Sequence, residues 1–186
     1  MADIKAIKGT DNVTYNLRDD YSKWGGENLF NYTGLKTHNQ ELQLNNYQNT
    51  GSFTQFTDSL VFDPSATIGQ RYTVSFDAIS PNGDTAIQLY NSNSNPKYFN
   101  FNAGSLGTVT TSWKHFTKTI TNNQYSGTAT PSTNTGIWKR IEIYAPSKMG
   151  VKVRNVKVEF GDKETDWSPC YKSIFTISGT ELQVNL

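Results

Sequence analysis

Residues 71–79 read Arg-Tyr-Thr-Val-Ser-Phe-Asp-Ala-Ile, and apolar and polar side chains alternate along this stretch. Side chains two residues apart lie on the same face of a β-strand. One face therefore carries the apolar residues Tyr72, Val74, Phe76 and Ala78, and the other carries Arg71, Thr73, Ser75 and Asp77. The alternation predicts a strand with one face in a hydrophobic core and the other on a surface.

Seven further segments have the same β character and are separated by turn-forming residues at fairly even intervals: 41–47, 53–62, 85–91, 97–102, 113–120, 137–145 and 151–160. Short strands at regular spacing are typical of sandwiches and barrels, and about eight strands suit a jelly roll. Within 137–145, the alternation predicts an inner row of Ile141, Ile143 and Ala145. Within 151–160, the apolar phase changes between Val153 and Val156, which predicts a β-bulge at Arg154-Asn155.

Both ends of the chain show hairpin patterns. Residues 4–17 alternate around a Gly-Thr-Asp-Asn turn at 9–12, and residues 173–186 alternate around Gly179-Thr180. We therefore predict an all-β jelly-roll β-sandwich with short terminal β-hairpins. It divides into an attachment hairpin at 1–27, the jelly roll at 28–169 and an assembly hairpin at 170–186. Docking of the hairpins on a partner chain and folding back on the sandwich remain alternatives.

The composition excludes several classes of protein. Charged residues make up 18% of the chain and the net charge is +1, so the basic surface of a nucleic-acid binder is not indicated. Cys170 is the only cysteine, which excludes a disulfide within the chain. The first residues lack a signal segment, and no apolar run approaches membrane-spanning length. We expect synthesis in a cytoplasm and no membrane insertion.

The run Val-Lys-Val-Glu-Phe-Gly-Asp-Lys-Glu-Thr-Asp-Trp-Ser-Pro at 156–169 resembles the closing segment of tail and minor structural proteins of bacteriophages. In such proteins a last strand is followed by Glu, a Gly-containing turn and Thr-Asp-Trp-(Ser/Thr)-Pro. Together with Asn28-Leu29-Phe30, the run resembles the frame of carbohydrate-binding-module-like jelly rolls. The opening, residues 4–10 and 14–19, is similar to N-terminal segments of phage tail and head-fibre proteins. Glu164 departs from the family pattern, which has a smaller residue there.

The resemblance implies a virion surface location after synthesis in the host cytoplasm. It also implies other virion proteins as partners and, by analogy with phage fibres, a homotrimer. A purely structural reading of the ending is that Trp167 covers the bottom of the core and Pro169 ends the strand pairing.

A ligand-binding face is predicted from the outward rows of three strands. It comprises Ser75 and Asp77, then Gln88 and Tyr90, then Arg140, Glu142 and Tyr144. Aromatic rings stack on sugar rings, and amide, carboxylate and guanidinium groups hydrogen-bond hydroxyls in pairs, so this mixture suits a glycan. The alternative is that these side chains only cover the outer side of a sandwich.

Calcium ties the first and last strands in similar jelly rolls, so the resemblance also implies a structural calcium ion. The candidate ligands are Asn28, Glu159, Asp162 and Asp166, all of which carry oxygen atoms. The sequence has no Asp-x-Asp-x-Asp loop with glycine to strengthen this prediction.

Motifs for catalysis are scarce. His38 and His115 are far apart, and the sequence has no His-x-x-x-His pair, no Gly-x-Ser-x-Gly elbow and no phosphate-binding glycine loop. Asp77 and Glu142 could act as a glycosidase pair if they shared one face. We predict that the chain is not an enzyme but a phage virion surface protein, on a tail or head fibre, that binds host or environmental glycans. The alternative is a structural virion component that binds other virion proteins and no sugar.

Overall fold

The computed structural model describes Ala6–Lys8, Thr14–Asn16, residues 26–62, 69–90, 102–122 and 140–170, Phe175–Ser178 and Glu181–Val184. For the four terminal strands and for Tyr90, Asn102 and Ala103, the backbone alone is described. The predicted strand residues 97–101 and 137–139 lie outside the described residues.

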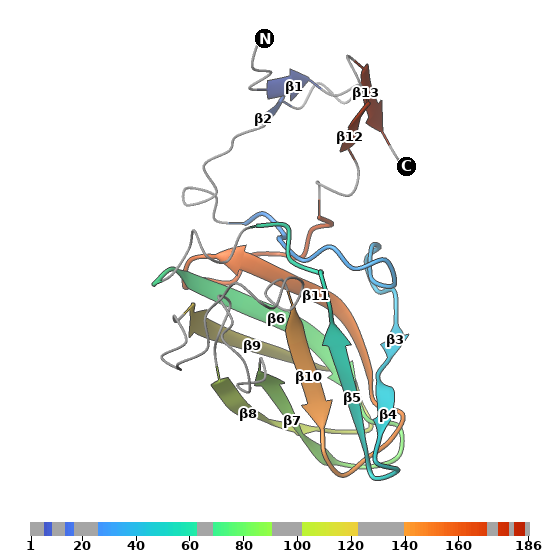
Figure 1. Ribbon diagram of the computed structural model, residues 1–186. Coiled ribbons are helices and arrows are strands. Elements are labelled where there is room, and N and C mark those ends of the chain that lie inside the picture. Colours follow the sequence, from blue (N-terminus) through green and yellow to red (C-terminus); the bar gives the residue numbers. More distant parts are fainter. Residues whose placement is uncertain are drawn as a thin grey trace, which may run out of the picture.

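The described residues form a sandwich of nine strands: β3 (Leu42–Gln43), β4 (Asn45–Tyr47), β5 (Gly51–Phe56), β6 (Arg71–Ile79), β7 (Thr85–Tyr90), β8 (Asn102–Val109), β9 (Lys114–Thr121), β10 (Ile141–Ala145) and β11 (Lys152–Phe160). One sheet has five strands in the order β4-β5-β10-β7-β8, and the other has four in the order β3-β11-β6-β9. Their paired strands are antiparallel, and Figure 1 shows the sheets as two layers.

The chain crosses between the sheets at six of the eight connections of the sandwich, for example from β5 to β6, from β6 to β7 and from β10 to β11. This alternation between two antiparallel layers is the jelly-roll arrangement that the sequence predicts. No described segment is a helix long and apolar enough to cross a membrane.

Each end of the chain contributes a separate two-stranded sheet. β1 (Ala6–Lys8) pairs with β2 (Thr14–Asn16), and β12 (Phe175–Ser178) pairs with β13 (Glu181–Val184). Figure 1 shows both hairpins as elements distinct from the sandwich. The predicted terminal hairpins are thus present, while the roles of attachment and assembly remain predictions.

The core lies between the sheets and is built from the predicted inner rows. Tyr72, Val74, Phe76 and Ala78 of β6 are 0% exposed, as are Ile141, Ile143 and Ala145 of β10. The predicted bulge is also present: the pairing of β11 with β6 shifts register between Arg154 and Lys157, and Asn155 has a φ of 52°. Because of the bulge, Val153 and Val156 both reach the core.

Three strands differ from the prediction. The segment 41–47 divides at the buried Leu44, with β3 in one sheet and β4 in the other. The segment 53–62 ends as a strand at Phe56, because the backbone turns at Asp58, where φ is 52°. No strand was predicted between residues 102 and 113, where β8 runs from Asn102 to Val109.

Glycine explains why β8 was missed. Gly104 and Gly107 have φ values of 63° and 120°, and the pairing of β8 with β7 shifts register twice. Glycine in a strand pattern weakens the alternation and often marks such irregularities.

Phe56 and Phe53 on β5 give a direct test of the two faces of the sheet. Phe56 is 0% exposed, with its ring centroid 5.4 Å from that of Phe30, whereas Phe53 points outward and is half-buried. We expect Phe56→Ala to lower the free energy of unfolding by about 3–5 kcal/mol, and Phe53→Ala to lower it by about 1 kcal/mol. Urea unfolding curves measure both, and equal losses would contradict this assignment of inner and outer faces.

Candidate functional site

The register of the five-stranded sheet places side chains from its strands in rows across the outer face. Asn45, Phe53, Tyr144, Gln88 and Ser105 are successive cross-strand partners from β4 to β8. Cross-strand partners point to the same side of a sheet. Since Ile141, Ile143 and Ala145 of β10 point into the core, this row lies on the opposite, outer side.

Three aromatic residues gather on this face. The ring centroid of Tyr144 lies 5.4 Å from that of Tyr47 and 6.0 Å from that of Phe53, and the rings of Tyr47 and Phe53 are 5.5 Å apart. Tyr47 is 38% exposed, and Phe53 and Tyr144 are half-buried. We call these residues the aromatic cluster. Their edge-to-face and tilted packing is favourable for aromatic rings and orients each of them.

A network of polar side chains lies beside the aromatic cluster. The guanidinium of Arg140 is 2.7 Å from Oε1 of Glu142 through Nη2, and its Nη1 donates to Oε1 of Gln55 at 3.2 Å. The side chains of Arg140 and Glu142 are only 10% and 0% exposed. Opposite charges removed from water are tolerated when they are paired with good geometry. In these three residues, the polar triad, the buried Arg140 and Glu142 hold the exposed Gln55 in place next to the rings.

Four of the predicted ligand residues come together on this face: Gln88, Arg140, Glu142 and Tyr144. The backbone of Tyr90 pairs with Glu142 in the ladder between β7 and β10, and its side chain lies outside the description. The prediction did not include Tyr47, Phe53 or Gln55. The alternation of Phe53 and Gln55 with Thr54 and Phe56 was the signal for an outward row on β5.

The placement of Asp77 on this face is wrong. Asp77 and Ser75 belong to β6, in the four-stranded sheet, whereas Gln88 and Glu142 belong to the other sheet. Because the chain crosses between the sheets after β6, the outward rows of β6 and β7 face opposite sides of the sandwich. Sheets pack about 10 Å apart, so outward carboxylates on opposite sheets exceed the ~9.5 Å limit for a glycosidase pair. Asp77 and Glu142 cannot serve as such a pair.

Asp77 belongs instead to a cluster of charged groups on the outer side of the four-stranded sheet. Its Oδ1 is 2.8 Å from Nδ1 of His115, and its Oδ2 accepts hydrogen bonds from Arg154 at 3.2 Å and Asn155 at 2.8 Å. The guanidinium of Arg154 also stacks over the ring of Trp113, 4.1 Å from its centroid. Partial burial raises the pKa of Asp77, but these hydrogen bonds outweigh burial and hold the pKa below its usual value.

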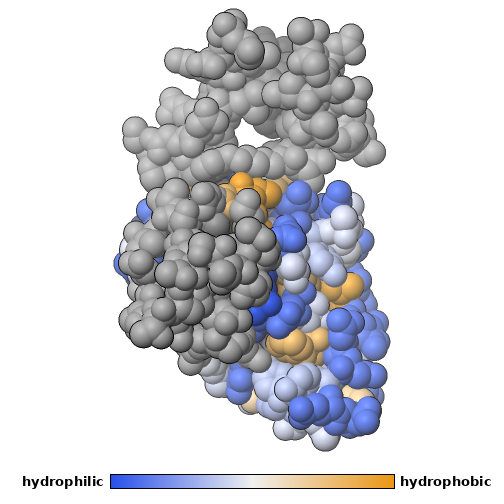
Figure 2. Space-filling model, viewed as in Figure 1, coloured by the Kyte–Doolittle hydropathy of each residue, from blue (hydrophilic) through white to orange (hydrophobic). Residues whose placement is uncertain are grey.

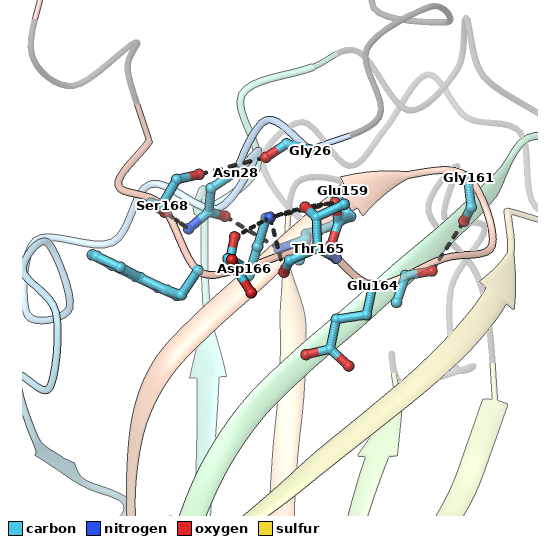
Figure 3. A network of polar contacts seen from close by, with 12 residues as sticks. Gly26, Asn28, Glu159, Gly161, Glu164, Thr165, Asp166 and Ser168 are labelled. Carbon is cyan, nitrogen blue, oxygen red and sulfur yellow. Dashed lines mark hydrogen bonds and ion pairs between the residues drawn. The ribbon is translucent and has the colours of Figure 1, made fainter.

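The predicted calcium ligand Glu159 is instead paired with a lysine. Its carboxylate accepts from the Thr165 backbone N–H at 2.9 Å and from Thr165 Oγ1 at 2.6 Å, and Nζ of Lys157 lies 3.3 Å away. Lys157 also donates to Thr165 Oγ1 at 2.5 Å and to the Asp166 carbonyl at 2.7 Å. Figure 3 shows this closing network between β11 and the segment after it. The side chains of Lys157 and Glu159 are 1% and 0% exposed.

Burial lowers the pKa of Lys157, and the neighbouring Glu159 carboxylate partly offsets this effect. The ammonium and the carboxylate thus compensate each other in a site closed to water.

Both the nitrogen and the oxygen of the Asn28 side-chain amide form hydrogen bonds with the backbone. Its Nδ2 donates to the carbonyls of Val156 at 3.1 Å and Ser168 at 2.8 Å, and its Oδ1 accepts from the N–H groups of Phe30 at 2.9 Å and Val158 at 3.2 Å. The side chain therefore ties the first residues of the sandwich to its last strand and to the closing segment (Figure 3).

Trp167 also joins the closing segment to the last strand, because its Nε1 donates to the Val156 carbonyl at 3.3 Å. This contact supports the structural reading of the Thr-Asp-Trp-Ser-Pro ending.

The four predicted calcium ligands do not form one site. Glu159 is neutralised by Lys157, Asn28 binds backbone groups, and Asp162 pairs with Arg71 at 2.8 Å. Among the described residues, no group of three or more His, Cys, Asp or Glu side chains could hold a metal ion. Lys157 supplies the positive charge that a cation would bring to Glu159. The structural calcium ion itself remains a prediction.

No protein-family model matches the chain, and no curated protein matches its sequence. A solved structure of the tripod from the baseplate of bacteriophage Tuc2009 is similar, with 16% identity and a TM-score of 0.49 over 81% of this chain and 61% of that chain. This chain thus spans less than two thirds of that baseplate protein.

Carbohydrate-binding modules are also among the structural neighbours. A CBM4 module has 11% identity and a TM-score of 0.37, over 73% of this chain and 81% of that chain. A CBM6 module of the Cellvibrio mixtus lichenase 5A, solved with cellotriose, has 10% identity and a TM-score of 0.32, over 72% of this chain and 96% of that chain. Similarity at this level transfers no function to the chain.

Lys157 and Glu159 can be tested as a pair. We expect Lys157→Met to lower the free energy of unfolding by about 3–5 kcal/mol, because the Glu159 carboxylate is left buried without its ammonium partner. The double variant Lys157→Met/Glu159→Leu should regain part of this loss, since no charge is then left unpaired. Urea unfolding at neutral pH measures both, and a double variant no more stable than Lys157→Met would contradict the pairing.

Chelation tests the role of calcium in the closing network. Because Lys157 already neutralises Glu159, we expect the melting temperature to be the same with calcium and with an excess of a calcium chelator. A fall of several degrees in chelator would show that a calcium ion stabilises the sandwich.

Proposed function

We propose that the chain binds a glycan on the outer face of its five-stranded sheet and acts as a surface protein of a phage particle, on a tail or head fibre. The observation that carries the proposal is the aromatic cluster beside the polar triad. Aromatic side chains normally lie in a core, and here the core is already filled by the inner rows of both sheets.

The chemistry of the face suits a sugar. Rings of Tyr47, Phe53 and Tyr144 offer apolar surfaces for the C–H faces of sugar rings. Gln55, which is exposed, and Gln88, which is half-buried, offer planar amide groups, which recognise neighbouring hydroxyls through paired hydrogen bonds. The buried Arg140 orients Gln55. A few oriented polar groups beside apolar surface are the usual composition of a ligand site.

The charge of the face indicates which class of glycan it would bind. Among its described residues, Arg140 and Glu142 are the charged ones, and they neutralise each other at 2.7 Å. The whole chain has a net charge of only +1. Binding to polyanions relies on an excess of positive charge, so the face favours an uncharged glycan. Figure 2 agrees with a polar contact surface, because most of the visible described surface is hydrophilic with small apolar patches.

The location on a virion is supported by the closing segment. Its Thr-Asp-Trp-Ser-Pro ending resembles phage tail and minor structural proteins, and the closing network shows how this ending stabilises the sandwich. Other virion proteins as partners, and a homotrimer, belong to the same proposal. The terminal hairpins are the elements available for such contacts.

Binding to isolated bacterial surface glycans tests the proposed face. We expect Tyr47→Ala and Tyr144→Ala each to weaken binding about tenfold, which corresponds to about 1.4 kcal/mol, a common loss for a contact residue at a ligand site. Thr117→Ala, on the exposed outer side of β9 in the other sheet, is the matched control and should bind as the unaltered chain does.

Two results would contradict the proposal. A folded chain that binds no cell surface and no glycan would favour a structural virion component that contacts only other virion proteins. Release of reducing sugar from a bound glycan would instead show a hydrolase, for which the described residues of this face offer no pair of carboxylates.

A further inference from the structure

His115 is held between two carboxylates that come from different parts of the chain. Its Nδ1 lies 2.8 Å from Oδ1 of Asp77 on β6, and its Nε2 lies 2.6 Å from Oε1 of Glu164 in the closing segment. We propose that Asp77, His115 and Glu164 form a pH-sensitive clasp that holds the closing segment against the outer side of the four-stranded sheet.

The two contacts of His115 determine how many protons its ring must carry. A carboxylate can only accept a hydrogen bond, so each ring nitrogen of His115 must carry a hydrogen to bind both partners. The ring is then a cation between two anions. When the ring loses a proton, one nitrogen presents a lone pair to a carboxylate, and that contact becomes repulsive. The clasp is therefore closed with the charged ring and open with the neutral ring.

The surrounding charges favour the closed state. Arg154, from β11, binds the second oxygen of Asp77, which keeps this carboxylate ionised and in place. Partial burial lowers the pKa of His115, but Asp77 and Glu164 outweigh it and raise the pKa above its ordinary value of 6.5. His115 is 49% exposed, so solvent weakens each contact and the clasp makes only a modest contribution.

Glu164 is the residue of the closing segment that reaches His115. It stands where the resembling phage endings have a smaller residue, which could not reach His115. Thr165, Trp167 and Ser168 of the closing segment contact β11 and residues 26–28. At the start of the segment, Asp162 pairs with Arg71 of β6, and its carbonyl accepts a hydrogen bond from Thr119 of β9. The clasp adds a second connection to β6 and β9, further along the segment. It lies on the sheet opposite the proposed glycan face and does not depend on the proposed function.

The pH dependence has a defined sign. A group whose pKa is higher in the folded state stabilises the fold fully below its unfolded pKa, and this contribution disappears as the pH rises through the folded pKa. The clasp should therefore stabilise the protein near pH 5.5 and contribute nothing near pH 9.

Glu164→Gln tests the clasp with little change of shape. We expect the variant to melt about 1–3 °C below the unaltered protein near pH 5.5 and at the same temperature near pH 9. Glu41→Gln is the matched control, because it breaks an exposed ion pair of 2.9 Å with Lys152 that involves no histidine. Its effect on the melting temperature should be the same at both pH values.

Titration of the His115 ring by NMR gives a second readout that does not depend on stability. The ring signal is identified by its loss in His115→Asn, since the chain has two histidines. We expect the pKa of His115 to fall in Glu164→Gln. An unchanged pKa, or an equal loss of melting temperature at both pH values, would overturn the clasp.

Discussion

The burial of Lys157 and Glu159 on the outward side of β11 is the constraint on which the rest of the structure depends. Two charged side chains on the outer side of a sheet would normally face water, yet here they are at most 1% exposed. The closing segment covers them and satisfies them through Thr165 and the Asp166 carbonyl. Asn28 ties the start of the sandwich to Ser168, so the chain enters and leaves the sandwich at one place. Both terminal hairpins therefore connect to the same region.

The outer faces of the two sheets differ in the contacts that they make. The four-stranded sheet carries the closing segment, the ion pairs around Asp77 and the stacked Arg154 and Trp113, all of which bind other parts of the chain. The five-stranded sheet carries the aromatic cluster and the polar triad, whose residues lie on β4, β5 and β10 or directly before β10. One layer of the jelly roll thus has the contacts of a structural support and the other has the composition of a binding surface.

The sequence predicted what depends on local alternation. The inner rows of β6 and β10, the bulge at Asn155 and the terminal hairpins follow from side-chain periodicity and turn residues. The order of strands in a sheet does not follow from local alternation, and this is why Asp77 was assigned to the wrong face. The side chain of Asp77 does point outward from β6, as predicted, but β6 and β7 lie in different sheets. Phe53 and Tyr47 became site residues only through their pairing with β10 and β5. Glu159 was predicted to bind calcium by resemblance to similar jelly rolls, and the sequence alone did not show that Lys157, two residues away, is buried beside it as the cation.

Chemical-shift mapping by NMR shows which of the two sheets a glycan binds. Unlabelled surface oligosaccharide from host cells is titrated into isotope-labelled protein, and the backbone amides of both sheets are followed. The account predicts saturable shifts for Phe53, Gln55, Gln88 and Tyr144, with the amides of β6 and β9 unchanged. Shifts confined to β6, β9 and the closing segment, or no shifts with any surface glycan, would contradict it.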